Sequence, residues 1–442
     1  MPFTKIALIG ANGTLGPHIV SAIQAAPSLN LTILTRASSK SAYGSTPTLS
    51  IPDDLPTSAL VEALKGFDSL VITMAGSYVA ECLRLADAAF VAGVKRIIPP
   101  DFGSCDSADP ETLEILPLMA GKAKVRAHLE ELCGREREGG KLTWTSLITG
   151  HFFDYGLRGG LLCFDVRKKK VQVLDGGDIK FSATNLDTIG TAVVKVLTKE
   201  EQAVVENKLL YVHSFHVTQN ELLKVLEKAT GSEGKWELEQ CSSKELLAVS
   251  RAKMLKGDAE ATEEVVAVHG IVASDWEGKE GFANELLGLE KEDLVECVTK
   301  VVESLAKASE AQTAAGHNAF EWRRFLDFTK IEADKLAAEY PSLKDVPANI
   351  YAGILVRVNE KLRNQGIREI GDDVFDWRMP QAMRRAYALK TPLQEEASKP
   401  ADRPHEQQPP AEQPSTSSKA YDPVKESVLH NTDSEKGLAL DQ

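Results

Sequence analysis

Short apolar runs alternate with longer amphipathic stretches along the first 150 residues. Runs such as LVIT and RIIP lack polar alternation, which is typical of strands that are covered on both faces. The alternation predicts an α/β fold with a doubly wound parallel sheet and helices on both of its faces. Strands are expected at 5–9, 30–35, 68–73, 95–98 and 142–148, and helices at 14–25, 57–65, 77–92 and 122–133.

The pattern becomes less regular after residue 150. A turn at Asp175–Gly177 separates two apolar runs and predicts a hairpin, and a helix is expected from about Asp187. Thr218 with Glu221 three residues later has the spacing of a capping box at the start of another helix. Residues 151–303 are therefore interpreted as a smaller mixed α/β region that packs beside the first domain and closes a substrate cleft.

The last third of the chain divides by composition. Residues 304–318 are small and polar and are expected to be a linker, whereas 319–389 have apolar positions at helical spacing, including Trp322 and Trp377, and predict a helical extension. From 390 to 442 the chain holds seven prolines and few apolar residues. Such a segment cannot bury enough surface to fold, so a disordered tail is expected.

Length and composition restrict the class of protein. The 442 residues are typical of two to three domains, and the formal charge of −13 argues against a broad nucleic-acid-binding surface. The six cysteines form no CxxC pair and no metal-ligand spacing, so free thiols and no metal site are expected. No signal peptide precedes the first strand, and no apolar run approaches the roughly 18 residues of a membrane span. A soluble, cytoplasmic protein is expected.

Three glycines spaced three apart follow the first predicted strand in GANGTLG. In a dinucleotide-binding domain, such glycines permit the turn, let the backbone approach a pyrophosphate and let the helix pack on the strand. The phosphates then bind the free N–H groups at the helix start. Gly10, Gly13 and Gly16 have GxxGxxG spacing, a variant of GxGxxG. A tight strand-to-helix turn without a ligand is the alternative interpretation.

The end of the second predicted strand bears on the choice of nucleotide. Arg36 lies 20 residues beyond Gly16, where an acidic residue would bind the ribose hydroxyls of NAD and an arginine suits the 2′-phosphate of NADP. Lys40 offers a second positive charge. Solvated loop charges are the alternative, but the glycines, the strand and the arginine together favour NADP(H) in a Rossmann-like domain at 1–150.

Two lysines, Lys122 and Lys124, lie on a predicted helix downstream of RIIPPDFG. Strand ends on this side of a doubly wound sheet line the ligand crevice. A lysine that is shielded from water beside a cofactor can serve as a general acid or base, although a solvated surface charge is the alternative for any single lysine. The pair Tyr340 and Lys344 has Tyr-x-x-x-Lys spacing but lies outside this domain and is interpreted as coincidental.

The motifs GANGTLG, LTRASSK, ADAAFVAGVKRIIPPDFG and GKAKVRAHLEE, in this order and spacing, resemble the NmrA-like family. This family includes the isoflavone reductase-like enzymes and is an atypical branch of the short-chain dehydrogenases/reductases. The resemblance covers about 1–303, and its second half fits fungal-type members. It implies phosphate contacts at Arg36 and Lys40 and a general base at Lys122. The implied cofactor contacts in the glycine segment are Gly10, Asn12, Gly13, Thr14, Leu15 and Gly16.

This chain departs from the plant reductases at two places. Pro100 and Asp101 stand where the plant enzymes usually have Ser-Glu before Phe-Gly, and ITGHFFDYG replaces a polar stretch. The residues that face the nicotinamide and the substrate are therefore altered, which leaves the substrate open. His151 is interpreted as either a proton relay or a packed, hydrogen-bonded histidine. The candidate residues of this site are Phe102, Thr149, His151, Phe152 and Phe153.

Two further features are interpreted as structural. His213 and His216 are three residues apart, and strand geometry would point them to opposite faces, so a metal site is not expected. Cys105 follows the PPDFG segment and is either a reactive thiol or an inert loop cysteine.

The predicted function is that of an NADPH-dependent reductase acting on a small, aromatic or conjugated metabolite. The alternative is an NADP(H)-binding regulatory protein that passes the redox state to a partner without turnover. The segment 319–442 lies outside the minimal family plan and is a candidate surface for a protein partner. No nucleic-acid or membrane partner is expected.

Overall fold

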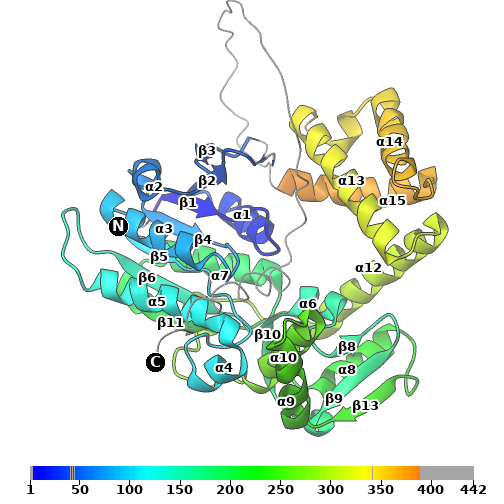
Figure 1. Ribbon diagram of the computed structural model, residues 1–442, viewed down its shortest axis with the longest axis horizontal. Helices are drawn as coiled ribbons and strands as arrows, with labels where there is room; N and C mark the ends of the chain where they lie inside the picture. The colour runs from blue at the N-terminus through cyan, green and yellow to red at the C-terminus, as the bar shows by residue number, and fades with distance from the viewer. Residues whose placement is uncertain (1–2, 40, 42, 44, 341, 389–442) are drawn as a thin grey trace, which may run out of the picture.

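The computed structural model describes residues 3–39, 41, 43, 45–340 and 342–388 (Figure 1). Two expectations from the sequence lie outside these residues, namely the disordered tail at 390–442 and the position of Lys40. None of the described helices combines the length and the apolar character that crossing a membrane requires.

The core of the first domain is a parallel sheet of seven strands in the order β11-β6-β5-β4-β1-β2-β3. The order confirms the doubly wound sheet, because the chain proceeds from β1 to β2 on one side and returns to β4 on the other. The strands are β1 (Lys5–Ile9), β2 (Asn30–Arg36), β3 (Thr48–Ile51), β4 (Ser69–Ile72), β5 (Arg96–Ile98), β6 (Thr143–Ile148) and β11 (Lys208–Tyr211).

Helices cover both faces of this sheet, as Figure 1 shows. Successive side chains of β1 point to opposite faces, so Ile6 and Leu8 join one apolar core while Ala7 and Ile9 join another. The first core includes α1 (Gly16–Gln24) and α7 (Leu186–Thr198). The second core includes α2 (Thr57–Leu64), α3 (Val79–Ala92) and α5 (Ala120–Cys133). The predicted strands and helices of this domain are all present, within a few residues at each end.

The sequence pattern missed two elements of this domain. β3 is a four-residue edge strand in which only Ile51 is buried, so it lacks the apolar run that marks the other strands. The second element is α4 (Pro110–Ile115), a short helix with Asp109 as its N-cap.

The second region is built on two three-stranded sheets. One has the order β12-β10-β7 and the other β13-β9-β8. Their strands are β7 (His151–Phe152), β8 (Phe164–Asp165), β9 (Lys170–Leu174), β10 (Phe181–Thr184), β12 (Phe215–Val217) and β13 (Glu237–Cys241). The helices around them are α6 (Phe153–Gly159), α8 (Gln219–Ala229), α9 (Ser243–Met254) and α10 (Ala259–Val272), whereas α11 (Asn284–Leu287) packs against α7 in the core of the first domain.

The hairpin predicted at Asp175–Gly177 is wrong. β9 pairs with β13 and β8, whereas β10 pairs with β12 and β7, so the turn joins two different sheets. Gly176 and Gly177 both have positive φ angles, 84° and 82°, which lets the chain leave one sheet and enter the other. The capping box of Thr218 and Glu221 is present at the start of α8.

The segment expected to be a linker, 304–318, is mostly helical. It lies in α12 (Leu294–Ala315), which ends at Gly316 in the left-handed conformation. The small residues of this segment are mainly alanines, which favour helix, and the buried side chains of Leu305, Ala311 and Ala315 anchor it. The segment therefore joins the two parts of the chain as a helix rather than as an irregular linker.

The predicted helical extension is present as three helices with a core of their own. They are α13 (Ala319–Glu339), α14 (Ala348–Arg363) and α15 (Asp372–Ala388). This C-terminal module has an apolar core that includes Trp322, Phe325 and Met379. Figure 1 places the module to one side of the sheet domain, with α15 nearest to α1.

A buried carboxylate joins the helices of this module. Glu332 has only 1% of its side chain exposed and pairs with Lys361 at 2.8 Å, Arg357 at 2.9 Å and Lys335 at 3.1 Å. Burial acts to raise the pKa of Glu332, but the hydrogen bonds from the three cations outweigh it and lower the pKa to about 2.

Because the C-terminal module has its own apolar core, we expect that a substitution in this core destabilises the module without destabilising the rest of the chain. Phe325 is fully buried, so Phe325→Ala should cost about 3–5 kcal/mol of unfolding free energy in this module. Limited proteolysis followed by mass spectrometry should then show cleavage within 319–388 while the first 300 residues stay protected. Phe320→Ala is the control, because this side chain lies on the same helix and is 63% exposed. Equal cleavage in the two variants would contradict the prediction.

Candidate functional site

The strand order places a topological switch point at the carboxyl ends of β1 and β4. These strands are neighbours, and the chain continues from them in opposite directions across the sheet. Doubly wound sheets bind ligands at such a point because the loops that follow the two strands diverge. The GANGTLG loop follows β1, and the loop containing Gly76 follows β4.

The GANGTLG loop packs so closely that two of its glycines are required. Gly10 has a φ of +95°, and a Cβ there would lie 2.6 Å from the Thr73 Oγ1. Thr73 donates to the Ile9 carbonyl from its N–H at 2.9 Å and from its Oγ1 at 3.0 Å. A Cβ on Gly16 would lie 2.5 Å from the carbonyl group of Ala11. The Gly13 N–H closes the turn by donating to the Gly10 carbonyl at 3.1 Å.

The start of α1 has no side-chain cap. The N-cap Leu15 is buried and provides no side-chain hydrogen bond, and Pro17 follows in the first turn. Uncapped N–H groups and the positive end of the helix dipole suit phosphate oxygens. Thr14 is half-buried, and the Asn12 side chain donates to the Ser41 hydroxyl in the loop after β2. This loop, with its close backbone packing and uncapped helix start, fits the phosphates of a dinucleotide.

Arg36 ends β2 with an exposed side chain. Among the described residues, its guanidinium has no hydrogen bond or ion pair. The adjoining turn is held by Asp53, which accepts from the Ser38 N–H at 3.0 Å and from the Ser38 hydroxyl at 2.8 Å. The backbone and hydroxyl of Ser38 lower the pKa of Asp53, with a further contribution from Arg36. A cation at this strand end can pair with a phosphate group.

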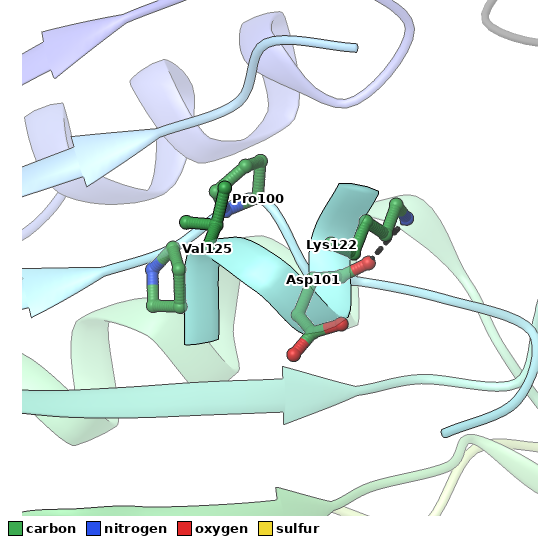
Figure 2. Close-up of a pocket in the computed structure, with 5 residues that line it drawn as sticks. Pro100, Asp101, Lys122 and Val125 are labelled. Atoms are coloured by element: carbon green, nitrogen blue, oxygen red, sulfur yellow. Dashed lines mark hydrogen bonds between the residues drawn. The ribbon is translucent and has the colours of Figure 1, made fainter. Parts of the chain in front are cut away.

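Lys122 reaches toward the same edge of the sheet from α5. Its Nζ donates to the Asp101 carbonyl at 2.6 Å, the contact drawn in Figure 2. A Cβ on Gly76 would lie 3.3 Å from the Lys122 Cε, so the lysine stem covers the loop after β4. Burial lowers the pKa of Lys122 below the ordinary lysine value. Together with Pro99, Pro100, Asp101 and Val125, it lines a hollow too small to admit a water molecule. The Lys124 side chain, in contrast, is exposed.

Sequence reasoning missed the ionic network beside Lys122. Arg126 has 7% of its side chain exposed and donates to the Asp101 Oδ2 from Nε at 3.0 Å and from Nη2 at 2.7 Å. Its Nη1 donates to Asp106 at 2.8 Å, and the Ser107 hydroxyl donates to the Asp101 Oδ1 at 2.9 Å. One signal was available: Arg126 follows Lys122 by four residues and so shares its helix face.

The aromatic candidates lie after β5 and β6: Phe102 is in the loop after β5, Phe152 ends β7 and Phe153 begins α6. Phe102 is 7% exposed and has a φ of +25°, a strained value for a residue other than glycine. Phe102 and the half-buried Phe152 both contact the core beneath α1 and α7. Phe153 instead packs in the core of the second region, and the Thr149 side chain is buried and donates to the Gly150 carbonyl.

His151 lies against α10 and away from solvent. It is 3% exposed, and its Nε2 is 3.0 Å from the Ala267 carbonyl. Burial lowers the pKa of His151 to about 4. Gly270 has no Cβ and so admits the ring, because a Cβ there would overlap the Nε2. The contacts of this ring are those of a packed, hydrogen-bonded histidine.

The expected placement of His213 and His216 is wrong. Their rings stack with centroids 5.7 Å apart, because His213 precedes β12 and does not share its alternation. His216 lies 2.8 Å from Asp275 and 2.7 Å from Glu277. No group of three or more ligating side chains in the described part of the chain has the arrangement of a metal site. Cys105 is fully buried, and burial raises its pKa to about 11.

Comparison with known proteins agrees with this geometry. The model of the NmrA-like family matches residues 3–248. Oxidoreductase aprR of Aspergillus flavus is 32% identical over 303 residues, 67% of this chain and 98% of that protein. Isoflavone reductase homolog IRL of Zea mays is 30% identical over 242 residues, 52% of this chain and 75% of that protein.

A solved structure, AtPrR2 with NADP+ and (+)pinoresinol, has the same fold. Its TM-score is 0.54 at 22% identity, and the match covers 68% of this chain and 99% of that chain. The family model ends at residue 248, before the C-terminal module. Since the family model covers more than half of the residues and the Aspergillus relative is matched over almost its whole length, the chain belongs to the NmrA-like family.

Proposed function

We propose that this protein is an NADPH-dependent reductase of a small aromatic or conjugated metabolite, with Lys122 as the group that moves the proton. The observation that carries the proposal is the position of the Lys122 amine. It belongs to a half-buried side chain, donates to the Asp101 carbonyl, and lies over the loop after β4 beside the glycine loop. Oxidoreductase names among the curated relatives support this enzyme class.

The cofactor contacts follow the loop geometry. The pyrophosphate would bind the backbone of the glycine loop and the uncapped start of α1, at Gly10, Asn12, Gly13, Thr14, Leu15 and Gly16. Arg36, joined by Lys40, would pair with the 2′-phosphate that distinguishes NADPH from NADH. When bound, NADPH supplies the hydride. Related folds that carry NADP+ or NADPH support the choice of cofactor.

Lys122 would then exchange a proton with the substrate. Burial lowers its pKa, so the amine gives up its proton at a lower pH than a solvated lysine. A group with a pKa closer to neutrality serves better as a general acid or base. Phe102 and Phe152 would offer apolar surface to a ring, with His151 packed behind the loop. The names of relatives that act on aromatic compounds support this substrate class.

One observation favours a regulatory role as the second candidate. The C-terminal module has its own core, and the family model ends before it. A protein that binds NADPH and signals to a partner would use such a module without turnover.

The glycine loop predicts a steric effect on cofactor affinity. Gly10→Ala should weaken NADPH binding at least about tenfold, because the added methyl would overlap Thr73 and displace the loop. Fluorescence titration with NADPH measures the effect. Gly66→Ala is the matched control, since Gly66 has a similar φ of +80° but open space around it. A comparable loss of affinity in both variants would count against the cradle.

Arg36 predicts the selectivity between the two nicotinamide cofactors. Arg36→Ala should weaken NADPH binding roughly 10–100-fold, the value of a charge-assisted pair, and leave NADH binding unchanged. Calorimetric titration of both cofactors measures the two affinities. Arg135→Ala, which changes an exposed arginine on another element, should alter neither. Equal affinities of the unaltered protein for NADPH and NADH would refute the 2′-phosphate contact.

Lys122 predicts the outcome of a turnover assay. NADPH consumption across a panel of quinones, enones and phenolic compounds should fall about 10²–10⁴-fold in Lys122→Ala, while NADPH binding persists. Lys124→Ala should retain activity, because this side chain is exposed on the same helix. Tight NADPH binding with no turnover of any compound would favour the regulatory role.

A further inference from the structure

The carbonyl that holds Lys122 belongs to a residue whose side chain is itself clamped. Asp101 has 2% of its side chain exposed, and both of its carboxylate oxygens accept hydrogen bonds. Arg126 and Ser107 donate them, and Arg126 also donates to Ser107 at 2.8 Å. The Asp101 N–H donates to the Pro99 carbonyl at 2.8 Å. Hydrogen bonds of its backbone N–H and of its carboxylate therefore hold Asp101 in place, and this sets the direction of its carbonyl group.

Helix geometry connects this clamp to the amine. Lys122 and Arg126 are four residues apart on α5, so their side chains leave the same face of the helix. One binds the Asp101 carbonyl and the other binds its carboxylate. A single loop residue thus receives two cations from one helix, and each fixes the other's geometry.

We propose that the Asp101–Arg126 pair is a positioning device that sets the place and the charge state of the Lys122 amine. The proposal rests on the proposed function, because positioning matters only if Lys122 handles a proton. Arg126 and Asp101 act here through Lys122 and touch no substrate. Neither residue was among the sequence-based candidates for catalysis.

The charged groups around Lys122 predict the direction in which each substitution should shift the pKa of its amine. Burial lowers the pKa of Lys122, Asp101 raises it, and Arg126 lowers it. The thiols of Cys105 and Cys82, from the loop after β5 and from α3, also face the amine. Loss of the Asp101 charge should lower the pKa of Lys122, and loss of the Arg126 charge should raise it. A merely structural role would not move the two variants in opposite directions.

The clamp extends to the far edge of the sheet. Asp106 accepts from Arg126 and also from the Tyr211 hydroxyl, at 3.1 Å, where β11 ends. The Lys279 amine lies 4.4 Å from the centre of the Tyr211 ring. Although burial acts to lower it, the pKa of Arg126 is raised by the two carboxylates, so this cation keeps its charge. In Asp106→Asn, Arg126 loses one of the two carboxylates that neutralise its charge. The pKa of Lys122 should therefore fall, but by less than in Asp101→Asn.

The experiment measures the protonation of Lys122 without a substrate. The full chain is treated with trace acetic anhydride from pH 6 to 11, and acetylation of each lysine is quantified by mass spectrometry. Lys124, which is exposed two residues along the same helix, is the internal reference. The variants are Asp101→Asn, Asp106→Asn and Arg126→Gln. Glu332→Gln is the matched control, because it removes a carboxylate that is equally buried and cation-bound but lies in the C-terminal module.

The midpoint of Lys122 acetylation should fall by about one pH unit in Asp101→Asn and by less in Asp106→Asn. It should rise in Arg126→Gln and stay unchanged in Glu332→Gln. No shift in Asp101→Asn, a shift in Asp106→Asn as large as that in Asp101→Asn, or a fall in Arg126→Gln would overturn the proposal. If one variant fails to fold, the other two still differ in sign or size.

The proposed function is tested separately by turnover in Lys122→Ala. Full activity there would overturn the catalytic role of Lys122 while the acetylation shifts still report the electrostatic pair. Loss of activity with unchanged midpoints would keep the catalytic role and reject the positioning device.

Discussion

The contact between the loop after β1 and the end of β4 is the constraint on which the site depends. Thr73 donates two hydrogen bonds to the Ile9 carbonyl, and Gly10 lies so close to Thr73 that it admits no side chain. The sheet reverses its order at this point. The uncapped start of α1 therefore lies on one side of the contact, and Gly76 with the Lys122 stem over it lies on the other. The proposed phosphate-binding loop and the Lys122 side chain therefore both depend on this contact.

Buried charge at this edge is better explained by geometry than by stability. Replacing a buried ion pair with apolar groups is often neutral, whereas removing one partner costs about 3–5 kcal/mol. The Asp101–Arg126 pair is therefore weak evidence for stability, and removing one of its partners is expected to be strongly destabilising. The Asp101 carbonyl accepts a hydrogen bond from the Lys122 amine. We therefore attribute the burial of the Asp101–Arg126 pair to its effect on the position of this amine. Glu332 shows the same arrangement used to join α13 to α14.

The C-terminal module is a second folding unit attached through a long helix. α12 carries Leu305 in the core of the second region and Ala311 in the core of the module. One continuous helix therefore packs into both cores. It fixes the position of α13–α15 relative to the second region. The NmrA-like family model matches residues 3–248, so the module lies outside the part that this model describes.

Local pattern was sufficient for much of this protein. Runs such as SLVI at β4 are buried on both faces, and the capping box of Thr218 and Glu221 depends on residues three apart, so both are legible in the sequence. Glycine spacing and the family motifs likewise indicated the loop and Lys122. Contacts between distant residues were decided only by the tertiary structure. Asp101 binds Arg126, 25 residues away, β9 and β10 join different sheets, and His213 stacks on His216. Burial and strand pairing depend on the packing of the whole chain, and the residues adjacent in sequence do not determine them.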